Sequence, residues 1–550
     1  MLEAQGISIA IHRLDGTRKT EVVLCQRILC KKFHLTQADL TGFAMRRRSI
    51  DARKKNDIHL TYTVRFNLAG GSHAEAALLK RVSPKRGRIT LKLIEEKEPQ
   101  FPTNLGIALP KRPCVIGAGC AGLFCALTLA KAGLSPLLIE RGDDATRRTE
   151  SVETFNETGT LNPESNIQFG LGGAGTFSDG KLNTGTKNPL HRLILQTFVE
   201  AGAPKDILYD AKPHIGSDIL PAVVTHLAER IEDAGGTVLF NTKLLDIELT
   251  QNRSLCGVSV RRGNGHKETI HTSHTILACG HSARDVFSLL AEKGVILERK
   301  TFAMGVRIEH LQSTIDRAQY GPEAGNPVLG AAPYKLVAHP KESRSAFSFC
   351  MCPGGSVVAA SSEMGGVCTN GQSLAARSGT NANSGLLVNV FPDDLVGNDP
   401  LAAIELQRSC ERKAYELGGG AYRAPAQLVG DFLAAKPSSG PGSVKPTYPR
   451  GVAWGEIDGC LPSYITDTLR LAIPLLGHRL HRFDEYDAVL TAPETRSSSP
   501  VRVVRTKEGQ SANTSGLWPC GEGAGYAGGI MSAATDGIRI AQRLIDTLAH

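Results

Sequence analysis

Residues 111–142, KRPCVIGAGCAGLFCALTLAKAGLSPLLIERG, decide the fold of this chain. The apolar run Cys114–Ile116 leads directly into the glycine-rich turn Gly117–Gly122, and a helical pattern of apolar residues follows. A second apolar run, Leu137–Ile139, ends in Glu140. A strand, a tight turn, a helix and a parallel strand in this order predict a βαβ unit that binds a dinucleotide.

Each glycine of this turn has its own physical reason. Gly117 permits a sharp exit from the strand, Gly119 lets a pyrophosphate approach the backbone, and Gly122 lets the helix lie close to the sheet. The helix N-terminus offers free N–H groups and partial positive charge to phosphates. Glu140 stands about 20 residues past the glycines, where a carboxylate accepts hydrogen bonds from a ribose hydroxyl and repels a 2′-phosphate. The cofactor-binding residues predicted in this unit are Gly117, Gly119, Cys120, Ala121, Gly122, Glu140 and Arg141.

Further glycine-rich segments favour FAD over NAD. Residues 166–182 are too rich in glycine for a helix or a packed strand and predict a backbone-lined loop close to a flat ligand. Residues 516–529 form a second strand-to-helix junction near the C-terminus. FAD needs one helix end at its pyrophosphate and another at its ribityl chain and flavin edge, whereas NAD needs only the first. The cofactor-binding residues predicted in these segments and after the strand 275–280 are Gly173, Gly175, Thr176, Gly280, Gly521, Glu522, Gly529 and Ile530.

The order of the elements predicts an α/β fold in four segments. Residues 1–110 are expected to form a small basic α+β domain, and residues 111–297 the first part of a doubly wound, Rossmann-like FAD-binding domain. Residues 298–484 are expected to form an inserted, mostly antiparallel β domain that serves as a substrate or cap domain, and residues 485–550 return to the FAD-binding domain. Within the first segment, Val22–Leu24 is expected as a strand and Thr36–Phe43 as a helix.

Composition limits the class of protein. The chain has 550 residues, 41% of them hydrophobic, and its apolar runs are far shorter than a membrane span. The opening residues do not follow a signal-peptide pattern, so we expect a cytoplasmic protein, with import into an organelle left open. The 13 cysteines do not suggest a disulfide scaffold, and the absence of a C-x-x-C pair or a zinc-type Cys/His spacing predicts no metal site.

Two basic clusters lie in the first segment, RRRSIDARKK at 46–55 and a second patch at 80–92. Such clusters are able to hold nucleic acid or another polyanion. The alternative is a solvated basic face, and we favour it because no stacking aromatic residues interleave the arginines. The net charge of +9 is modest for this length.

With these motifs in hand, the chain resembles the uncharacterised FAD-dependent dehydrogenase-like proteins, a branch of the FAD-binding class with glutathione-reductase-type and hydroxybenzoate-hydroxylase-type folds. The motifs span nearly the whole chain and are RRRSIDARKK, GAGCAG, GLGGAGTFSDGKLNTGTK, GHSARD, FCMCPGG, NANS, ETRSSSPVR and CGEGAGYAGGIMSAATDG. The resemblance implies FAD as cofactor and an inserted domain over the flavin, and it brings no substrate. It also implies that Glu522 takes the place of the more usual Asp that binds the ribityl hydroxyls.

Five residues are candidates for the chemistry. Cys350 and Cys352 form a C-x-C pair, and regular strand alternation would point both to one face, where either a redox role or simple packing is open. A direct disulfide between them would be strained. Arg284, Arg496 and Lys181 stand in motif loops and are candidates for binding an anionic substrate or stabilising reduced flavin, with a structural ion pair as the alternative for each.

The sequence therefore predicts a FAD-dependent oxidoreductase that moves hydride or electrons through a non-covalent flavin, with NAD(P)H as a candidate transient reductant. The expected partner is a small, anionic substrate. Two alternatives stay open: a flavin-dependent RNA-modifying enzyme that grips RNA with its basic domain, and a non-catalytic FAD-binding regulator.

Overall fold

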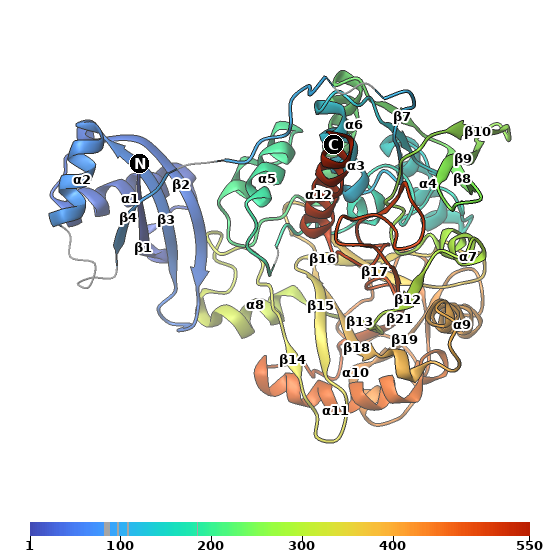
Figure 1. Ribbon diagram of the computed structural model, residues 1–550. Helices are drawn as coiled ribbons and strands as arrows, with labels where there is room; N and C mark the ends of the chain where they lie inside the picture. Colours follow the sequence, from blue (N-terminus) through green and yellow to red (C-terminus); the bar gives the residue numbers. More distant parts are fainter. Residues whose placement is uncertain (82–88, 96–97, 107–108, 184, 550) are drawn as a thin grey trace.

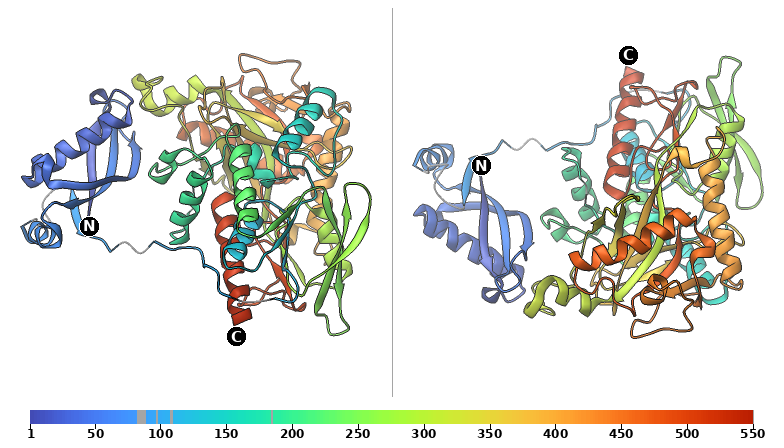
Figure 2. Two further views of the ribbon diagram at one scale, coloured as in Figure 1. Left: turned by 90° about the horizontal axis from the view of Figure 1, so that it is seen from above. Right: turned by 90° about the horizontal axis from the view of Figure 1, so that it is seen from below.

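The structure is a computed structural model that describes residues 1–81, 89–95, 98–106, 109–183 and 185–549. Figure 1 shows a small N-terminal domain beside a larger body, whose upper part carries α3 and α12 and whose lower part carries a large sheet. The views in Figure 2 show the same separation, with an extended linker joining the N-terminal domain to the body.

The N-terminal domain is a four-stranded antiparallel sheet, in the order β2-β3-β1-β4, with two helices. Its elements are β1 Leu2–Ala10, η1 Ile11–Arg13, α1 Arg18–Phe33, η2 Gln37–Asp39, β2 Leu40–Asp51, β3 His59–Leu68, α2 Gly71–Arg81 and β4 Thr90–Leu93. β2 also hydrogen-bonds to the main body, because Arg48 donates its N–H to the carbonyl of Tyr209 at 2.8 Å and accepts from Ala211 at 2.8 Å.

Two expectations for this domain are wrong. Val22–Leu24 lies in helix α1, which Thr17 caps and which buries Cys25, Leu29 and Phe33 at a spacing of four residues. Thr36 begins only a short 3-10 turn, and the chain then enters strand β2 at Leu40. The basic stretch 46–55 lies on β2 and the turn after it, while most of the second basic patch, residues 82–88, lies outside the described residues.

The FAD-binding part is built on a five-stranded parallel sheet in the order β23-β11-β5-β6-β7. Its elements are β5 Cys114–Ile116, α3 Cys120–Lys131, β6 Leu137–Ile139, α4 Ala145–Thr158, η3 Gly173–Phe177, α5 Leu190–Glu200, η4 Lys205–Leu208, α6 Leu220–Asp233, β7 Thr237–Leu239, β8 Thr242–Leu249, β9 Leu255–Arg262, β10 Lys267–His271, β11 Thr275–Leu277, α7 Arg284–Glu292, β12 Leu297–Arg299, β22 Val501–Val503, β23 Leu517–Pro519 and α12 Ile530–Ala549. Helices α3, α5, α6 and α12 share one apolar core with the sheet. The other face of the sheet is covered by α7 and the antiparallel strands β8–β10.

The inserted part is a seven-stranded sheet in the order β14-β15-β18-β13-β21-β19-β20, antiparallel except for the pair β19 and β20. Its elements are β13 Phe302–Leu311, α8 Gln312–Tyr320, η5 Gly321–Glu323, β14 Val337–Ala338, β15 Ala346–Cys352, β16 Gly355–Ala359, β17 Thr369–Ser373, β18 Asn381–Val390, η6 Pro392–Asp394, α9 Ala402–Leu417, β19 Ala424–Leu428, α10 Val429–Leu433, β20 Val452–Trp454, η7 Asp458–Cys460, α11 Ser463–Arg479 and β21 Val489–Glu494. Its central strand β13 is buried along almost its whole length.

The doubly wound, Rossmann-like domain with an inserted antiparallel domain is therefore confirmed as the fold. One boundary differs from the expectation. β21 pairs with β13 and β19, so the inserted sheet continues to Glu494, past the limit expected at residue 484. After α11 the chain adds one more strand, β21, to this sheet before it returns to the parallel sheet. Composition alone does not indicate this additional strand.

Candidate active site

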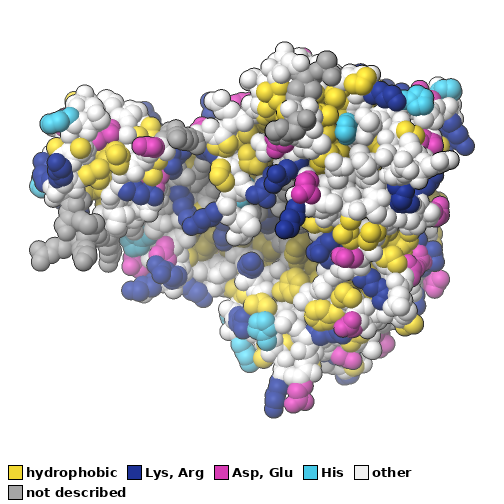
Figure 3. All heavy atoms as spheres, in the orientation of Figure 1, with side chains coloured by type: hydrophobic (Ala, Val, Ile, Leu, Met, Phe, Trp, Pro, Cys, Tyr) yellow, Lys and Arg dark blue, Asp and Glu magenta, His cyan; other side chains and the backbone are white. Residues whose placement is uncertain are grey.

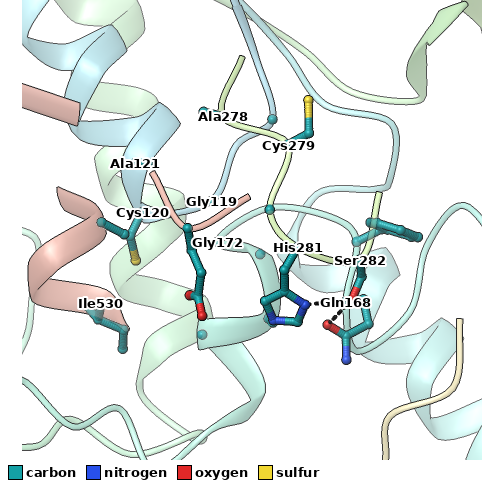
Figure 4. Close-up of a pocket in the computed structure, with 18 of the residues that line it drawn as sticks. Gly119, Cys120, Ala121, Gln168, Gly172, Ala278, Cys279, His281, Ser282 and Ile530 are labelled. Carbon is teal, nitrogen blue, oxygen red and sulfur yellow. Dashed lines mark hydrogen bonds between the residues drawn. The ribbon is translucent and has the colours of Figure 1, made fainter. Parts of the chain in front are cut away.

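A cavity of about 370 Å³ lies where the parallel sheet and the inserted sheet meet. This volume falls within the range of roughly 300–1,000 Å³ that is usual for ligand sites. In Figure 4, Gly119, Cys120 and Ala121 at the start of α3 lie on one side with Ile530 of α12, and Gln168, His281 and Ser282 lie on the other. Figure 3 shows that this face of the molecule is hollowed between its upper and lower parts, with Lys and Arg side chains at the border of the hollow.

The two glycine-rich junctions, far apart in the chain, meet at this cavity. A β-carbon on Gly521 would lie only 2.6 Å from that of Ala121, so the late junction touches the first turn of α3. A β-carbon on Gly175 would contact the side chain of Ile530 at 3.4 Å and the sulfur of Cys120 at 4.0 Å. The early turn, the 166–182 loop and the start of α12 therefore form one continuous wall.

The glycines of the early turn divide into two kinds. A β-carbon on Gly117 would lie 2.5 Å from the carbonyl oxygen of Ala278, and one on Gly122 would lie 1.8 Å from that of Gly117. These two glycines are needed for packing. Gly119 differs, because its β-carbon would have only the Cα of Gly173 nearby, at 3.8 Å, and the residue lines the cavity. A side chain at 119 would enter the cavity rather than the protein, as expected where a pyrophosphate approaches the backbone.

Glu140 fixes three backbone segments around the cavity. Its carboxylate accepts hydrogen bonds from the N–H groups of Ala118 at 2.7 Å, Gly142 at 3.0 Å and Gly170 at 2.9 Å. A carboxylate has about four acceptor sites, so one remains for a ligand hydroxyl. The next residue, Arg141, lies over the ring of Phe169 and pairs with Asp285 at 2.8 Å.

Glu522 stands at the late junction and lines the same cavity. Burial raises the pKa of Glu522 to about 7, although the N–H of Gly529, which donates to it at 3.3 Å, and the charge of Lys300 act in the opposite direction. An acidic group whose burial is not compensated by protein partners is suited to bind hydroxyl groups of a ligand.

His281 has a defined tautomer. Gln168 donates its amide N–H to the carbonyl of Ala360 at 3.3 Å, which leaves its oxygen to accept the hydroxyl of Ser282 at 3.0 Å. The oxygen of Ser282 can then only accept from Nδ1 of His281, at 3.1 Å, and Figure 4 shows this chain. Nε2 is therefore an acceptor, and burial, aided by Arg496 and Arg284, lowers the pKa of His281 to about 4.

The inserted sheet contributes thiols to the cavity, and the 166–182 loop contributes a cation. Cys350 and Lys181 line the cavity, while Cys352 is fully buried behind them. The amino group of Lys181 lies 4.0 Å from the sulfur of Cys352 and 3.2 Å from the carboxylate of Asp179. That carboxylate also binds Arg377, so two cations share a single buried anion and this part of the wall is positive.

A buried ion cluster stands beside the cavity. The carboxylate of Glu411 binds Arg284 at 2.8 and 2.9 Å and Arg496 at 2.6 and 2.9 Å. Burial alone would raise the pKa of Glu411, but the two arginines outweigh it and hold the pKa far below its usual value. Arg284 is 2% exposed and is absent from the cavity lining, whereas Arg496 is part of it.

The residues predicted from sequence to bind the cofactor all line the cavity except Gly122, Thr176 and Gly521. Thr176 turns away because its hydroxyl donates to the carbonyl of Leu171 at 3.1 Å, and Gly521 donates its N–H to Asp536 at 2.7 Å. Among the predicted catalytic residues, Cys350, Arg496 and Lys181 line the cavity and Cys352 lies next to it. Arg284 does not, because Glu411 holds it. The roles of all these residues stay predictions.

His281 follows the strand 275–280, where the sequence makes it a candidate proton relay with a satisfied loop histidine as the alternative, and it lines the cavity. Other lining residues are not among the sequence candidates, namely Gln168, Gly172, Ser178, Asn183, Thr242, Leu244, Ser282, Phe349, Asn370 and Ser497. A signal exists for Ser282, because ligands of a parallel sheet bind beyond the carboxyl ends of its strands and this residue follows β11. Asn370 carries no such signal, since it reaches the cavity from β17 of the inserted part.

Two kinds of site are absent from the residues that the structure describes. Among the described residues, no three His, Cys, Asp or Glu side chains are grouped so as to hold a metal ion. None of the described helices combines the length and the apolar character that a membrane crossing requires.

Comparison with known proteins assigns the chain to a family. Residues 301–497 match the profile of the C-terminal domain-like region of FAD-dependent proteins, residues 115–175 match the NAD(P)-binding Rossmann-like domain, and residues 17–67 match a domain of unknown function. A protein of Clostridium beijerinckii described as uncharacterised is 42% identical over 541 residues, which cover 98% of this chain and 99% of that protein.

Among solved structures, the chain is similar to the glycerol-3-phosphate dehydrogenase of Bacillus halodurans complexed with FAD, with 11% identity and a TM-score of 0.35. That match covers 81% of this chain and 65% of the enzyme, less than two thirds of its length. It is also similar to a flavoprotein/dehydrogenase of Cytophaga hutchinsonii, with 12% identity, a TM-score of 0.34 and coverage of 80% and 79%.

The cavity fits the cofactor that these profiles indicate. Gly119 leaves space at the start of α3, Glu140 retains an acceptor, and Glu522 lines the cavity at the second junction. Because the Clostridium relative matches over nearly its entire length and the inserted domain matches the FAD-dependent profile, the chain belongs to this family of FAD-dependent proteins and its cofactor is FAD.

Proposed function

We propose that the protein is a FAD-dependent oxidoreductase of dehydrogenase or reductase type, which moves hydride or two electrons between a small substrate and a non-covalent flavin. The observation that carries this proposal is the composition of the cavity wall. Glycines of the FAD-binding part and the residues Phe349, Cys350 and Asn370 from the inserted part border the same space.

FAD, when bound, supplies a two-electron acceptor and donor, and the chain supplies the surroundings. The N-terminus of α3 and Glu522 bind the cofactor at the two glycine-rich junctions. The inserted part forms one wall of the space. His281 is neutral near pH 7 and presents Nε2 as an acceptor, so it is suited to accept a hydrogen bond from a substrate group.

The substrate we propose carries an anionic group. Lys181 and Arg496 both line the cavity, and Lys181 shares the carboxylate of Asp179 with Arg377, which leaves this part of the wall positive. A lysine at such a position favours binding of a carboxylate or phosphate through its charge. NAD(P)H, itself anionic, is a candidate reductant for the same flavin.

The test begins with the purified protein. We expect flavin absorbance bands, bleaching on anaerobic photoreduction, and reoxidation or reduction of the flavin by a member of a panel of anionic metabolites or by NADH or NADPH. A folded protein that takes up no FAD would end the proposal. A protein that binds FAD but whose flavin no donor or acceptor in the panel changes would instead support the non-catalytic regulator.

The RNA-modifying alternative depends on the basic N-terminal domain. There Arg48 pairs with Glu21 at 3.0 Å and Asp210 at 3.8 Å, and Arg53 pairs with Asp51 at 2.6 Å. These contacts use the arginines within the protein and favour a structural role for them. Binding of tRNA that weakens steeply with salt would nevertheless revive this alternative.

A further inference from the structure

The C-x-C pair at the end of β15 does not follow ordinary strand geometry. The ladder between β15 and β18 is interrupted between Phe349 and Cys352, and Cys350 has a φ of 41°, in the left-handed region. A non-glycine residue in this region is strained, and such strain is frequent at functional sites. The interruption turns Cys352 back toward the preceding cysteine, because its thiol donates to the carbonyl oxygen of Cys350 at 3.2 Å.

The surroundings of the pair separate the two thiols electrostatically. The hydrogen bond from Cys352 lowers the pKa of Cys350 well below its usual value, and the charges of Lys181 and Arg307 act in the same direction against the effect of burial. The same hydrogen bond raises the pKa of Cys352. One thiol is thus prepared to be a thiolate and its neighbour to remain protonated.

Positive charge is available to hold that thiolate. Lys181 and Arg377 face the single carboxylate of Asp179, while Arg307 is neutralised by Glu494 at 2.7 Å and donates to the carbonyl of Cys350 at 2.9 Å. A thiolate at Cys350 would balance the excess charge of the first group. Thiolates, rather than thiols, attack and form disulfides.

Other cysteines of the cavity lack these features. Cys120 and Cys279 also line it, but burial raises the pKa of each to about 12. Neither forms a hydrogen-bonded pair with another thiol among the contacts that the structure describes. The pair at β15 is therefore distinct from thiols that merely pack against the cavity.

We propose that Cys350 and Cys352 are a redox-active dithiol, which closes to a disulfide when two electrons pass to FAD and reopens when they return. In closing, the S–H bond of Cys352 is broken and an S–S bond forms with the thiolate of Cys350. The two electrons released and the proton of Cys352 pass to FAD, so no further proton is taken up or set free. This inference rests on the proposed function, since it places the pair between the flavin and the substrate as a relay of two electrons.

The decisive experiment counts electrons. The holoprotein is oxidised with diamide, freed of reagent and titrated anaerobically with dithionite, while flavin absorbance is followed. We expect four electron equivalents per chain, two for FAD and two for the disulfide, and only two for Cys350→Ser and for Cys352→Ser. Cys30→Ser, which removes a thiol from α1 in the N-terminal domain, serves as the matched control and should still take up four.

A second readout identifies the bond without any flavin chemistry. After diamide treatment, alkylation and proteolysis, mass spectrometry should find the peptide that contains Cys350 and Cys352 two hydrogens lighter and unalkylated. Reduction before alkylation should restore both labels.

Two different results would separate a failure of the dithiol proposal from a failure of the proposed function. Uptake of only two electrons by the wild-type holoprotein, with both thiols alkylated after diamide treatment, would overturn the dithiol and leave the flavoenzyme standing. A folded protein that retains no FAD would overturn the proposed function itself. The number of electrons taken up by the wild-type protein and the mass of its Cys350–Cys352 peptide are sufficient to test the proposal. The proposal is therefore testable even if a serine variant does not fold.

Discussion

Replacement of Gly119 by Val should separate cofactor binding from folding. Gly119 has a φ of −74° and a ψ of 179°, a conformation that valine adopts readily, and its added β-carbon would come no closer than 3.8 Å to the protein. The valine methyl groups would stand in the cavity, at the place expected for the pyrophosphate. We therefore expect the apoprotein to keep its stability to within about 1 kcal/mol, as is usual for substitutions that disturb no buried contact.

The magnitude of the binding defect follows from the contacts that the phosphate would lose. Displacement from the start of α3 removes at least two charge-assisted hydrogen bonds, each contributing about 1.5–3 kcal/mol. The sum of about 3–6 kcal/mol corresponds to a Kd for FAD weakened by about 10²- to 10⁴-fold, since about 1.4 kcal/mol is a factor of ten. Titration of apoprotein with FAD, followed by flavin fluorescence, measures this change.

Two controls sharpen the test. Gly440→Val, in a loop where an added β-carbon would meet nothing within 4 Å, should alter neither binding nor stability. Gly122→Ala should destabilise the fold itself, because its β-carbon would lie 1.8 Å from the carbonyl oxygen of Gly117. If Gly119→Val binds FAD as the wild type does, with an unchanged melting temperature, then the phosphates do not lie at the start of α3 and the reasoning is refuted.

The remaining predictions concern single ionisable groups. Glu411→Gln should lower the free energy of unfolding in chemical denaturation by about 3–5 kcal/mol, because it removes the carboxylate that Arg496 and Arg284 share and leaves Arg284 with Glu363. Glu405→Gln on the exposed side of the same helix should cost at most about 1 kcal/mol, and equal effects of the two changes would contradict the ion cluster. Burial raises the pKa of Glu522 to about 7, so the folded apoprotein retains a proton that the unfolded chain releases above its usual pKa of 4.5. Its free energy of unfolding should therefore fall as the pH rises from about 4.5 to about 7, and Glu522→Gln should flatten that fall; an unchanged slope would exclude Glu522 as its source. Alkylation of Cys350 should reach its maximal rate below neutral pH, and Cys352→Ser should shift that profile to higher pH, since the Cys352 thiol is the first cause of the lowered pKa; a profile with an ordinary thiol midpoint would contradict the pairing.

The parts of the fold that could be predicted are those determined by residues close together in the sequence. The turn Gly117–Gly122 and the junction at Gly521 and Glu522 specify backbone shape through residue type, because only glycine tolerates the close approaches found there. The strands on either side are short apolar runs, and their parallel pairing follows once the intervening helix is recognised.

Short apolar runs that no glycine-rich turn flanks are compatible with either a strand or a helix. Val22–Leu24 is compatible with a strand, but the spacing of Cys25, Leu29 and Phe33 places one face of α1 in the core and decides for a helix. A window wider than three residues would have given the correct assignment.

The ion cluster could not be foreseen, because its members come from three distant segments. Arg284 follows the end of a strand and Arg496 stands in a motif loop. Ligand-binding residues are common at both kinds of position, so the sequence suggests that role for both. Glu411 is one acidic residue among several on α9, and nothing in its neighbours marks it as buried. The packing of α9 against the end of β21 decides that Glu411 holds both arginines.

The C-x-C pair was found from sequence, but its geometry was not. Regular alternation would point Cys350 and Cys352 to one face, whereas the structure interrupts the ladder at this point and gives Cys350 a positive φ. The turn Pro353–Gly354 that follows packs closely against a distant segment, since a β-carbon on Gly354 would lie 1.9 Å from the carbonyl oxygen of Arg377. Close approaches between segments distant in sequence leave no trace in a strand pattern.

The central claim, that two distant glycine-rich junctions hold one extended flavin, is tested most directly by the flavin content of the purified protein. Absorbance of the native protein and chromatography of the cofactor released by denaturation give both the amount and the identity of the flavin. The account predicts about one FAD per chain, released intact because it is not covalently bound. A folded protein that carries no flavin after incubation with FAD, or that binds NAD in its place, would contradict it.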